Sequence, residues 1–221
     1  MKNKIVKLDE AIKKINDGVT MMVGGFLSVG LPLGIIDAIV EKGVKDITLI
    51  SNDTGTPGRG NSKLIAAKLV KKVITSHIGT NPETGKQMME GTLEVQLVPQ
   101  GSLAEMIRAA GAGLGGVLTP TGAGTEAADG KQSIEIDNIE YLIELPIKAD
   151  VAILRGTVVD TFGNTFYNKT TQNFNPLMAT AADTVIVEAE KIVERGELDA
   201  NMVMTSGIFV DYIVRSDANE W

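Results

Sequence analysis

The sequence of 221 residues contains no cysteine and a single histidine, His77. The absence of cysteine excludes disulfide scaffolds, thiolate metal sites and thiol nucleophiles. A single histidine excludes sites with two imidazole ligands and leaves one candidate for a Ser-His-Asp triad. We therefore expect no metal site. His77 could act as a general base, but we favour its interpretation as a loop histidine that follows a strand.

Aromatic residues and positive charge are also scarce. Aromatic residues make up 4% of the chain, and the formal net charge is -7 at pH 7. Sequence-independent binding of nucleic acid draws on clustered lysine and arginine, and single strands stack on aromatic side chains. The composition therefore predicts no nucleic-acid partner. At 43% hydrophobic residues, the chain has enough apolar side chains for a core, which excludes a disordered protein.

The longest uncharged run, residues 19–36, has the length at which membrane spans begin. It contains four glycines and Pro32, which would interrupt a spanning helix. Residues 1–14 are charged throughout and contain no signal-peptide core. We therefore expect no membrane span and a cytoplasmic protein.

Short apolar runs alternate with helical patterns along the whole chain. Residues 19–23 predict a strand, Gly24-Gly25 a turn, residues 32–43 a helix and residues 46–51 a second strand, which together form a βαβ crossover. The same alternation predicts further strands at 73–76, 93–98, 151–154, 184–187 and 208–214, and further helices at 62–70 and 102–110. We find no repeat and no linker. The sequence therefore predicts one domain over residues 1–221, an α/β fold with an open, mainly parallel sheet and helices on both faces.

Four local patterns refine this prediction. Residues 133–145 resemble a hairpin that turns at Asp137-Asn138. Ser102 with Glu105 three residues later forms the pattern of a helix capping box. Residues 77–85 predict a glycine-bearing loop, and the glycine-rich residues 111–116 predict closely packed backbone.

Four glycine-bearing loops follow predicted strands, after Val23, Ser51, Ser76 and Val98. Ligands of open α/β sheets bind outside the carboxyl ends of the strands, so these loops should meet at one ligand-binding edge. The loop 24–30 combines glycines, which permit close approach of the backbone, with a following helix N-terminus. It matches neither a dinucleotide fingerprint nor a P-loop. A simple tight turn remains an equally open interpretation of this loop.

The candidate side chains at this edge are mostly uncharged. Asn52 and Gln100 follow two strands directly, where each could bind a polar ligand or cap its own loop. Three glutamates have simpler roles: Glu83 in a turn, Glu105 in the cap and Glu126 at the start of a helical turn. The pattern contains no convincing pair of nucleophile and base.

A family resemblance explains this absence. Residues 24–32 read G-G-F-L-S-V-G-L-P, which fits the motif G-G-F-x-x-x-G-x-P after an apolar run. Further matches, in family order, occur at residues 51–54, 79–85, 99–103, 111–116 and 173–176. The chain resembles the α subunit of the family I coenzyme A transferases, the 3-oxoacid and acetate CoA-transferase group. Within that group it is most similar to the short-chain enzymes that act on acetate, butyrate and acetoacetate.

The resemblance implies one half of an enzyme with the CoA-transferase fold, which is related to that of sugar-phosphate isomerases. In this family the nucleophile is a glutamate in a Ser-Glu-Asn-Gly motif of the β subunit, and this chain lacks that motif. We therefore expect no catalytic residue in this chain. The resemblance implies a β-subunit partner in an α2β2 heterotetramer. It also implies coenzyme A or acyl-CoA as a substrate, with no tightly bound cofactor.

The resemblance also assigns site residues. It implies that CoA binds to Gly24, Gly25, Phe26, Leu27, Ser28, Val29 and Gly30. Asn52 and Gln100 match family positions that face the acyl site. Two other classes of function remain as alternatives: an isomerase-like enzyme that uses Glu83 or Asp53 as its base, and a non-catalytic ligand-sensing module.

Overall fold

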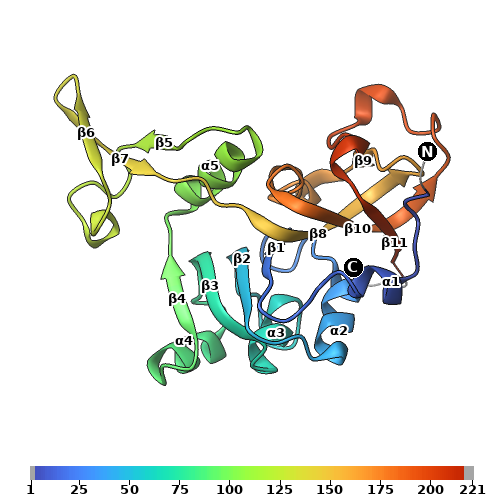
Figure 1. Cartoon of the computed structure of the whole chain (residues 1–221), viewed down its shortest axis with the longest axis horizontal. Coiled ribbons are helices and arrows are strands. Elements are labelled where there is room, and N and C mark those ends of the chain that lie inside the picture. The colour runs from blue at the N-terminus through green and yellow to red at the C-terminus, as the bar shows by residue number, and fades with distance from the viewer. Residues whose placement is uncertain (1–2, 217–221) are drawn as a thin grey trace.

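The computed structural model describes residues 3–216. Its main sheet has eight strands, and seven of them follow the order β11-β10-β8-β1-β2-β3-β4 (Figure 1). These strands are β1 (Thr20–Val23), β2 (Ile47–Asp53), β3 (Val70–His77), β4 (Glu94–Leu97), β8 (Ala149–Asp160), β10 (Ala182–Val193) and β11 (Tyr212–Arg215). Every neighbouring pair in that order is parallel, and β9 (Thr165–Phe166) pairs antiparallel with β8. The predicted, mainly parallel sheet is confirmed.

Helices cover both faces of this sheet, as predicted. The helices are α1 (Leu8–Ile12), α2 (Leu33–Lys42), α3 (Asn61–Ala66), α4 (Pro82–Met89), α5 (Gln100–Gly111) and α6 (Asn175–Met178). Short 3-10 turns lie at η1 (Glu126–Ala128), η2 (Lys169–Thr171), η3 (Ala200–Met202) and η4 (Gly207–Phe209). Buried residues form two clusters, one with α1, α2 and α3 and the other with α5 and α6.

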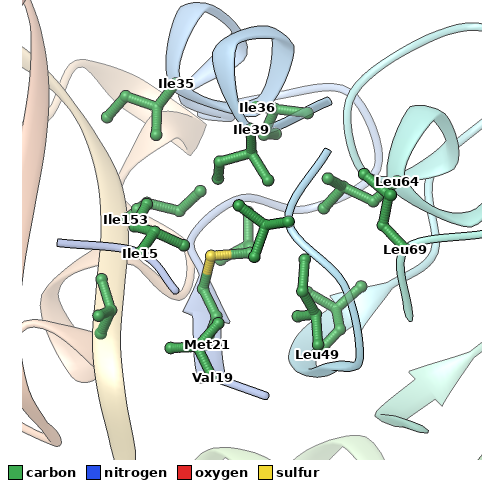
Figure 2. Packing of buried hydrophobic residues seen from close by; sticks show 14 of the residues in the cluster. Ile15, Val19, Met21, Ile35, Ile36, Ile39, Leu49, Leu64, Leu69 and Ile153 are labelled. Carbon is green, nitrogen blue, oxygen red and sulfur yellow. The ribbon is translucent and has the colours of Figure 1, made fainter. Parts of the chain in front are cut away.

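The strands supply the two clusters alternately, because successive side chains of a strand point to opposite faces. Met21 and Val23 of β1 belong to the cluster under α2, and Met22 lies in the cluster under α5. Figure 2 shows Met21 in the first cluster together with Ile36 and Ile39 of α2. An apolar run such as residues 19–23 is therefore buried on both sides.

A three-stranded antiparallel sheet projects away from the main sheet (Figure 1). This arm, residues 117–144, consists of β5 (Val117–Thr119), β7 (Ile139–Glu144) and β6 (Ser133–Ile136), in that order. The hairpin turns at Asp137 and Asn138, whose φ angles of 53° and 61° are those of a tight hairpin turn. The predicted hairpin is confirmed.

One face of the arm is apolar and exposed. The register aligns Leu118 with Ile143, Ile134 with Tyr141 and Ile136 with Ile139, so these six side chains share one face. Four of them, Leu118, Ile134, Ile136 and Ile139, are 42–48% exposed. On the other face, Leu142 is buried, and the buried Glu144 pairs with Lys131 at 2.6 Å. One face of the arm therefore contains buried side chains, and the apolar side chains of the other face are exposed.

Two local predictions are wrong. Residues 82–85, expected to belong to a loop over residues 77–85, lie in α4, because Pro82 is the first residue of a helix and Glu83 lies in its first turn. The capping box at Ser102 does not form, because α5 begins earlier, at Gln100. Glu105 pairs instead with Arg108 at 2.6 Å. The predicted helical turn at Glu126 is confirmed by η1.

Among residues 3–216, no helix combines the length and the apolar character that crossing a membrane requires. The uncharged run 19–36 is divided between β1, the glycine loop and the first turn of α2. Proline and glycine in this run therefore separate elements, as the sequence indicates.

The glycine-rich residues 111–116 are closely packed at two positions. A Cβ on Gly111 would overlap with the side chain of Thr180, and one on Gly116 would lie 2.9 Å from the Glu144 carbonyl oxygen. Gly113 and Gly115 have open space where a Cβ would be. The predicted close packing is thus confined to the ends of this segment.

We predict that Gly111→Ala lowers the free energy of unfolding by about 1–3 kcal/mol, because the added methyl group overfills the contact with Thr180. Gly115→Ala is the matched control, and it should change stability by less than about 1 kcal/mol, since nothing lies near its Cβ. Chemical denaturation of the purified chain measures both. Equal effects of the two variants would contradict the contact.

Candidate functional site

The loop 24–30 lies where the order of the sheet changes direction. From β1 the chain builds the sheet outward through β2, β3 and β4, and β8 then pairs on the other side of β1. The Gly24 amide donates to the Ile153 carbonyl of β8 at 3.0 Å, so the loop begins at the joint between the two halves. In open α/β sheets such a switch point is where ligands bind. The expected ligand-binding edge is therefore the location of this loop.

The loop folds into a small hairpin of its own. Phe26 and Val29 exchange two backbone hydrogen bonds of 3.0 Å each. Leu27, at the tip, has a φ of 53°, and its amide donates to Asp53 Oδ2 at 2.7 Å. Gly25 has a φ of 119°, a conformation that side chains disfavour. The glycine thus permits a bend, and an aspartate at the end of β2 holds the hairpin tip.

Few backbone amides of this loop remain free. The N–H groups of Gly24, Gly25, Phe26, Leu27 and Val29 all donate to acceptors within the chain. Among the described residues, the N–H groups of Ser28 and Gly30 have no hydrogen-bond partner. If the backbone of this loop donates to a ligand, these two amides are therefore the ones available.

Two asparagines from a distant segment hold the loop in place. Asn173 Oδ1 accepts from the Gly25 amide and its Nδ2 donates to the Val29 carbonyl, both at 3.1 Å. Asn175, fully buried, donates from Nδ2 to the Gly30 carbonyl at 3.0 Å. Its Oδ1 accepts from the Arg155 amide at 3.1 Å, just where β8 extends beyond the end of β1.

The same contacts explain two of the loop's glycines. A Cβ on Gly24 would overlap with the Asn175 side chain, and one on Gly30 would lie 3.0 Å from Nδ2 of both asparagines. Neither asparagine was among the predicted site residues. The sequence carries no local signal for the contact, because about 145 residues separate the partners.

Asn52 and Gln100 come together, as their positions at the strand ends predict. Gln100 Nε2 donates to Asn52 Oδ1 at 2.5 Å, and Asn52 Nδ2 donates to Asp53 Oδ2 at 2.8 Å. Asn52 is buried within β2 rather than in the loop after it, and Gln100 is the exposed first residue of α5. Through Asp53, which also holds Leu27, this amide pair is joined to the tip of the loop.

The carboxylates considered as bases are engaged in structural contacts. Asp53 accepts from the amides of Leu27 and Gly55 at 2.7 Å each, in addition to Asn52. Glu83 accepts from Gln87 within α4 at 2.9 Å. These contacts leave no observation in favour of either as a general base. Within residues 3–216, no group of three or more histidine, aspartate or glutamate side chains is arranged to hold a metal.

An apolar groove of about 800 Å³ runs beside the loop. Phe26, Leu27 and Val29 form one wall, and Pro176 and Leu177 of α6 form another. Phe26 and Val29 are 40% and 41% exposed. The loop therefore presents apolar side chains to open space next to the amide pair.

Comparisons with known proteins agree with this geometry. A family model described as "Coenzyme A transferase" matches residues 5–216. The chain is 51% identical over 218 residues to the acetoacetyl-CoA:acetate/butyrate CoA transferase alpha subunit of Clostridium acetobutylicum, covering 99% of this chain and 100% of that one. It is 48% identical over 220 residues to the acetate CoA-transferase subunit alpha of Escherichia coli K12, covering 100% of both chains.

Solved structures show the same fold. An acyl-CoA transferase from Escherichia coli O157:H7, in a thioester complex with CoA, superposes with a TM-score of 0.86 at 24% identity. The match covers 99% of this chain and 48% of that one, so this chain spans about half the length of that enzyme. The glutaconate coenzyme A-transferase of Acidaminococcus fermentans gives a TM-score of 0.82 at 20% identity, over 96% of this chain and 75% of the other.

We predict that Asn173→Ala loosens the loop 24–30 while the fold persists. The variant loses two hydrogen bonds to the loop, which together contribute about 1–3 kcal/mol. Amide hydrogen exchange of the Gly25 segment should therefore accelerate roughly tenfold or more. Hydrogen-exchange mass spectrometry of residues 24–31 measures it. The control is Asn201→Ala in η3, and unchanged exchange in the Asn173 variant would contradict the role.

Proposed function

The chain belongs to the coenzyme A transferase family, and on that premise we propose that it is the α subunit of a short-chain acyl-CoA:carboxylate CoA-transferase. Acetate, butyrate and acetoacetate are the proposed acids. One observation carries the proposal: about half of the residues are identical, over the full length of both chains, to α subunits named for these acids. We propose that the chain is a single domain that works in the cytoplasm.

The proposed reaction needs a carboxylate nucleophile that this chain does not provide. Asp53 and Glu83 are engaged in structural hydrogen bonds, and the chain has no Ser-Glu-Asn-Gly motif. We therefore assign the nucleophile to a glutamate of the partner β subunit. A covalent intermediate on that glutamate divides one difficult exchange into easier steps.

The proposed exchange proceeds in four steps, each a nucleophilic attack on an acyl carbon. The glutamate carboxylate attacks the acyl-CoA carbonyl, which gives an acyl-glutamyl anhydride and the CoA thiolate. The thiolate attacks the glutamyl carbonyl, which releases the first carboxylate and leaves a glutamyl-CoA thioester. The incoming carboxylate attacks this thioester, forming a second anhydride and freeing the thiolate again. Attack of the thiolate on the new acyl carbonyl gives the new acyl-CoA and restores the glutamate.

This chain contributes binding and orientation in that scheme. The loop 24–30 forms the CoA-binding segment, and Asn52 with Gln100 faces the acyl group. Each tetrahedral intermediate needs hydrogen-bond donors fixed in advance. The Gln100 side-chain amide, which is held by its contact with Asn52, is suited to that role. CoA enters as a substrate, so no tightly bound cofactor is required.

In this proposal, the arm contributes to the surface that binds the partner subunit. Its exposed apolar face is of the kind that marks interaction surfaces. Leu97 of β4 and Leu114, which precedes β5 in the chain, are also exposed apolar residues. We propose an α2β2 assembly. Its permanent interfaces should exceed about 2,000 Å².

No observation favours the two alternatives. An isomerase-like enzyme would need Asp53 or Glu83 as a base, and both carboxylates are engaged in structural hydrogen bonds. Both alternatives predict a chain that functions without a partner. The partner requirement therefore separates them from the transferase.

We predict that the purified chain alone has no CoA-transferase activity and that co-expression with the β subunit restores it. The measurement is transfer of CoA from acetyl-CoA to butyrate or acetoacetate, and the β subunit alone is the control.

Light scattering should give a heterotetramer for the pair and a homodimer or larger species for the lone chain. Robust activity of the lone chain would refute the two-subunit proposal.

We predict that His77→Gln keeps most of the activity of the assembled enzyme. His77 lies exposed at the end of β3, and the proposed chemistry requires no imidazole. The measurement is kcat/KM for the same exchange. A loss of about a hundredfold or more, as for removal of a general base, would favour the isomerase-like alternative.

A further inference from the structure

A second, smaller cavity also borders the loop hairpin. Its volume is about 120 Å³. Val29, Gly30, Leu31 and Leu33 form part of its lining, and the polar side chains that border it are those of Ser28, Arg59, Arg155, Thr171 and Glu190. Val29 borders both this cavity and the groove, so the two spaces adjoin the same hairpin.

One of the two arginines in the cavity is already paired. Arg155 contacts Glu190 at 2.9 Å and Glu188 at 3.1 Å. Glu188 lies behind Arg155, where it also accepts from the Ile35 amide and the Ser216 hydroxyl. Burial raises the pKa of the Glu188 carboxyl above its usual value. The charge of Arg155 is thus balanced by two carboxylates of the protein. Of these two, Glu190 also borders the cavity.

Arg59 differs from Arg155, because no carboxylate of the described residues lies within 4.0 Å of its guanidinium. Its Nε is shielded from solvent and has no hydrogen-bond partner among residues 3–216. A shielded N–H without an acceptor is costly, and the cost is recovered when a ligand oxygen accepts from it.

The backbone fixes Arg59 in this position. Its amide donates to the Thr56 carbonyl at 3.1 Å and to Ser62 Oγ at 3.0 Å. The next residue, Gly60, packs so closely on Leu31 that a Cβ would lie 2.5 Å from Leu31 Cδ1. The loop that carries Arg59 is therefore held against the end of the loop 24–30.

Further donors border the same cavity. The N–H groups of Ser28 and Gly30 are the two loop amides without a partner among the described residues. The Ser28 hydroxyl has one long contact, to Thr56 Oγ1 at 3.4 Å. A guanidinium with neighbouring amides and a hydroxyl is the donor set that binds oxyanions.

We propose that this cavity is an anion subsite in which Arg59, with the amides of Ser28 and Gly30, binds a carboxylate or phosphate group of a substrate. The inference rests on the proposed function for the identity of the substrate. The two sources of the anion are the carboxylate of the short-chain acid and the phosphates of CoA. Arginine suits both, because its planar fork binds two oxygens at once.

The first experiment tests the subsite without any enzyme activity. Thermal unfolding of the full chain is measured in acetate, in inorganic phosphate and in chloride at equal ionic strength. We expect acetate or phosphate to raise Tm above the value in chloride, and Arg59→Gln to abolish that difference. The matched control is Lys63→Gln, which removes the same charge from a surface pair with Asp37. Loss of the difference in both variants, or in neither, would overturn the proposal.

The second experiment identifies the source of the anion in the assembled enzyme. If the subsite binds the acid, Arg59→Gln raises KM for acetate about tenfold or more and leaves KM for acyl-CoA unchanged. If it binds a CoA phosphate, KM for acyl-CoA rises similarly, and KM for acyl-pantetheine, which has no phosphate, does not. Arg59→Lys should restore part of the affinity. Unchanged KM values for both substrates would overturn the subsite.

The two experiments separate this inference from the proposed function. Anion-dependent stabilisation that needs Arg59, in an assembly that transfers no CoA, would refute the proposed function and leave the subsite standing. Normal CoA transfer by the Arg59→Gln enzyme, together with unchanged stabilisation by anions, would refute the subsite alone. A variant that fails only to bind the β subunit would show that Arg59 pairs with the partner, which also overturns the proposal.

Discussion

The site depends on side-chain amides that replace a missing strand. β1 ends at Val23 while β8 continues, so the backbone of β8 loses its partner at Arg155. Asn175 takes that place, accepting from the Arg155 amide and donating to the Gly30 carbonyl. Because the Asn175 side chain hydrogen-bonds to both β8 and the loop, the loop lies close to the sheet and neither the Arg155 amide nor the Gly30 carbonyl is left without a partner. The place of the end of the loop 24–30 against β8 depends on that contact.

Neutral amides suit such a position better than charges would. A buried carboxylate or ammonium in place of Asn175 would lose hydration that the few nearby partners cannot replace. An asparagine side chain offers both an acceptor and donors, so one residue can join two backbones. The same reasoning applies to Asn52 and Gln100, which contact each other at 2.5 Å beside the loop. Asn52 and Gln100 therefore add polar groups to this edge without adding charge, and Asn52 donates to the one carboxylate in their network, that of Asp53.

Different residues of the loop hairpin line two different cavities. Phe26, Leu27 and Val29 line the apolar groove, and Ser28 and Gly30, whose amides have no partner among the described residues, line the smaller cavity together with Arg59. A thioester substrate with an apolar acyl chain and anionic groups needs both kinds of surface. In the proposed reaction the reacting carboxylate comes from elsewhere, and Asp53 and Glu190 near the loop are engaged in structural contacts. An exposed apolar arm on the same chain is consistent with a partner that supplies it.

The sequence by itself determined the layered α/β fold, because each strand needs an apolar run and each crossover a helix with its own signals. It also located the loop 24–30 and the Asn52–Gln100 pair, since the carboxyl ends of parallel strands meet at one edge. The helix α4 was missed because Pro82 and Gly85 are typical of turns and of helix ends alike. Only the tertiary structure decided which loop amides stay free and that Asn173, Asn175 and Arg59 surround the loop. Those contacts join residues far apart in the chain, and no local pattern specifies such a pairing.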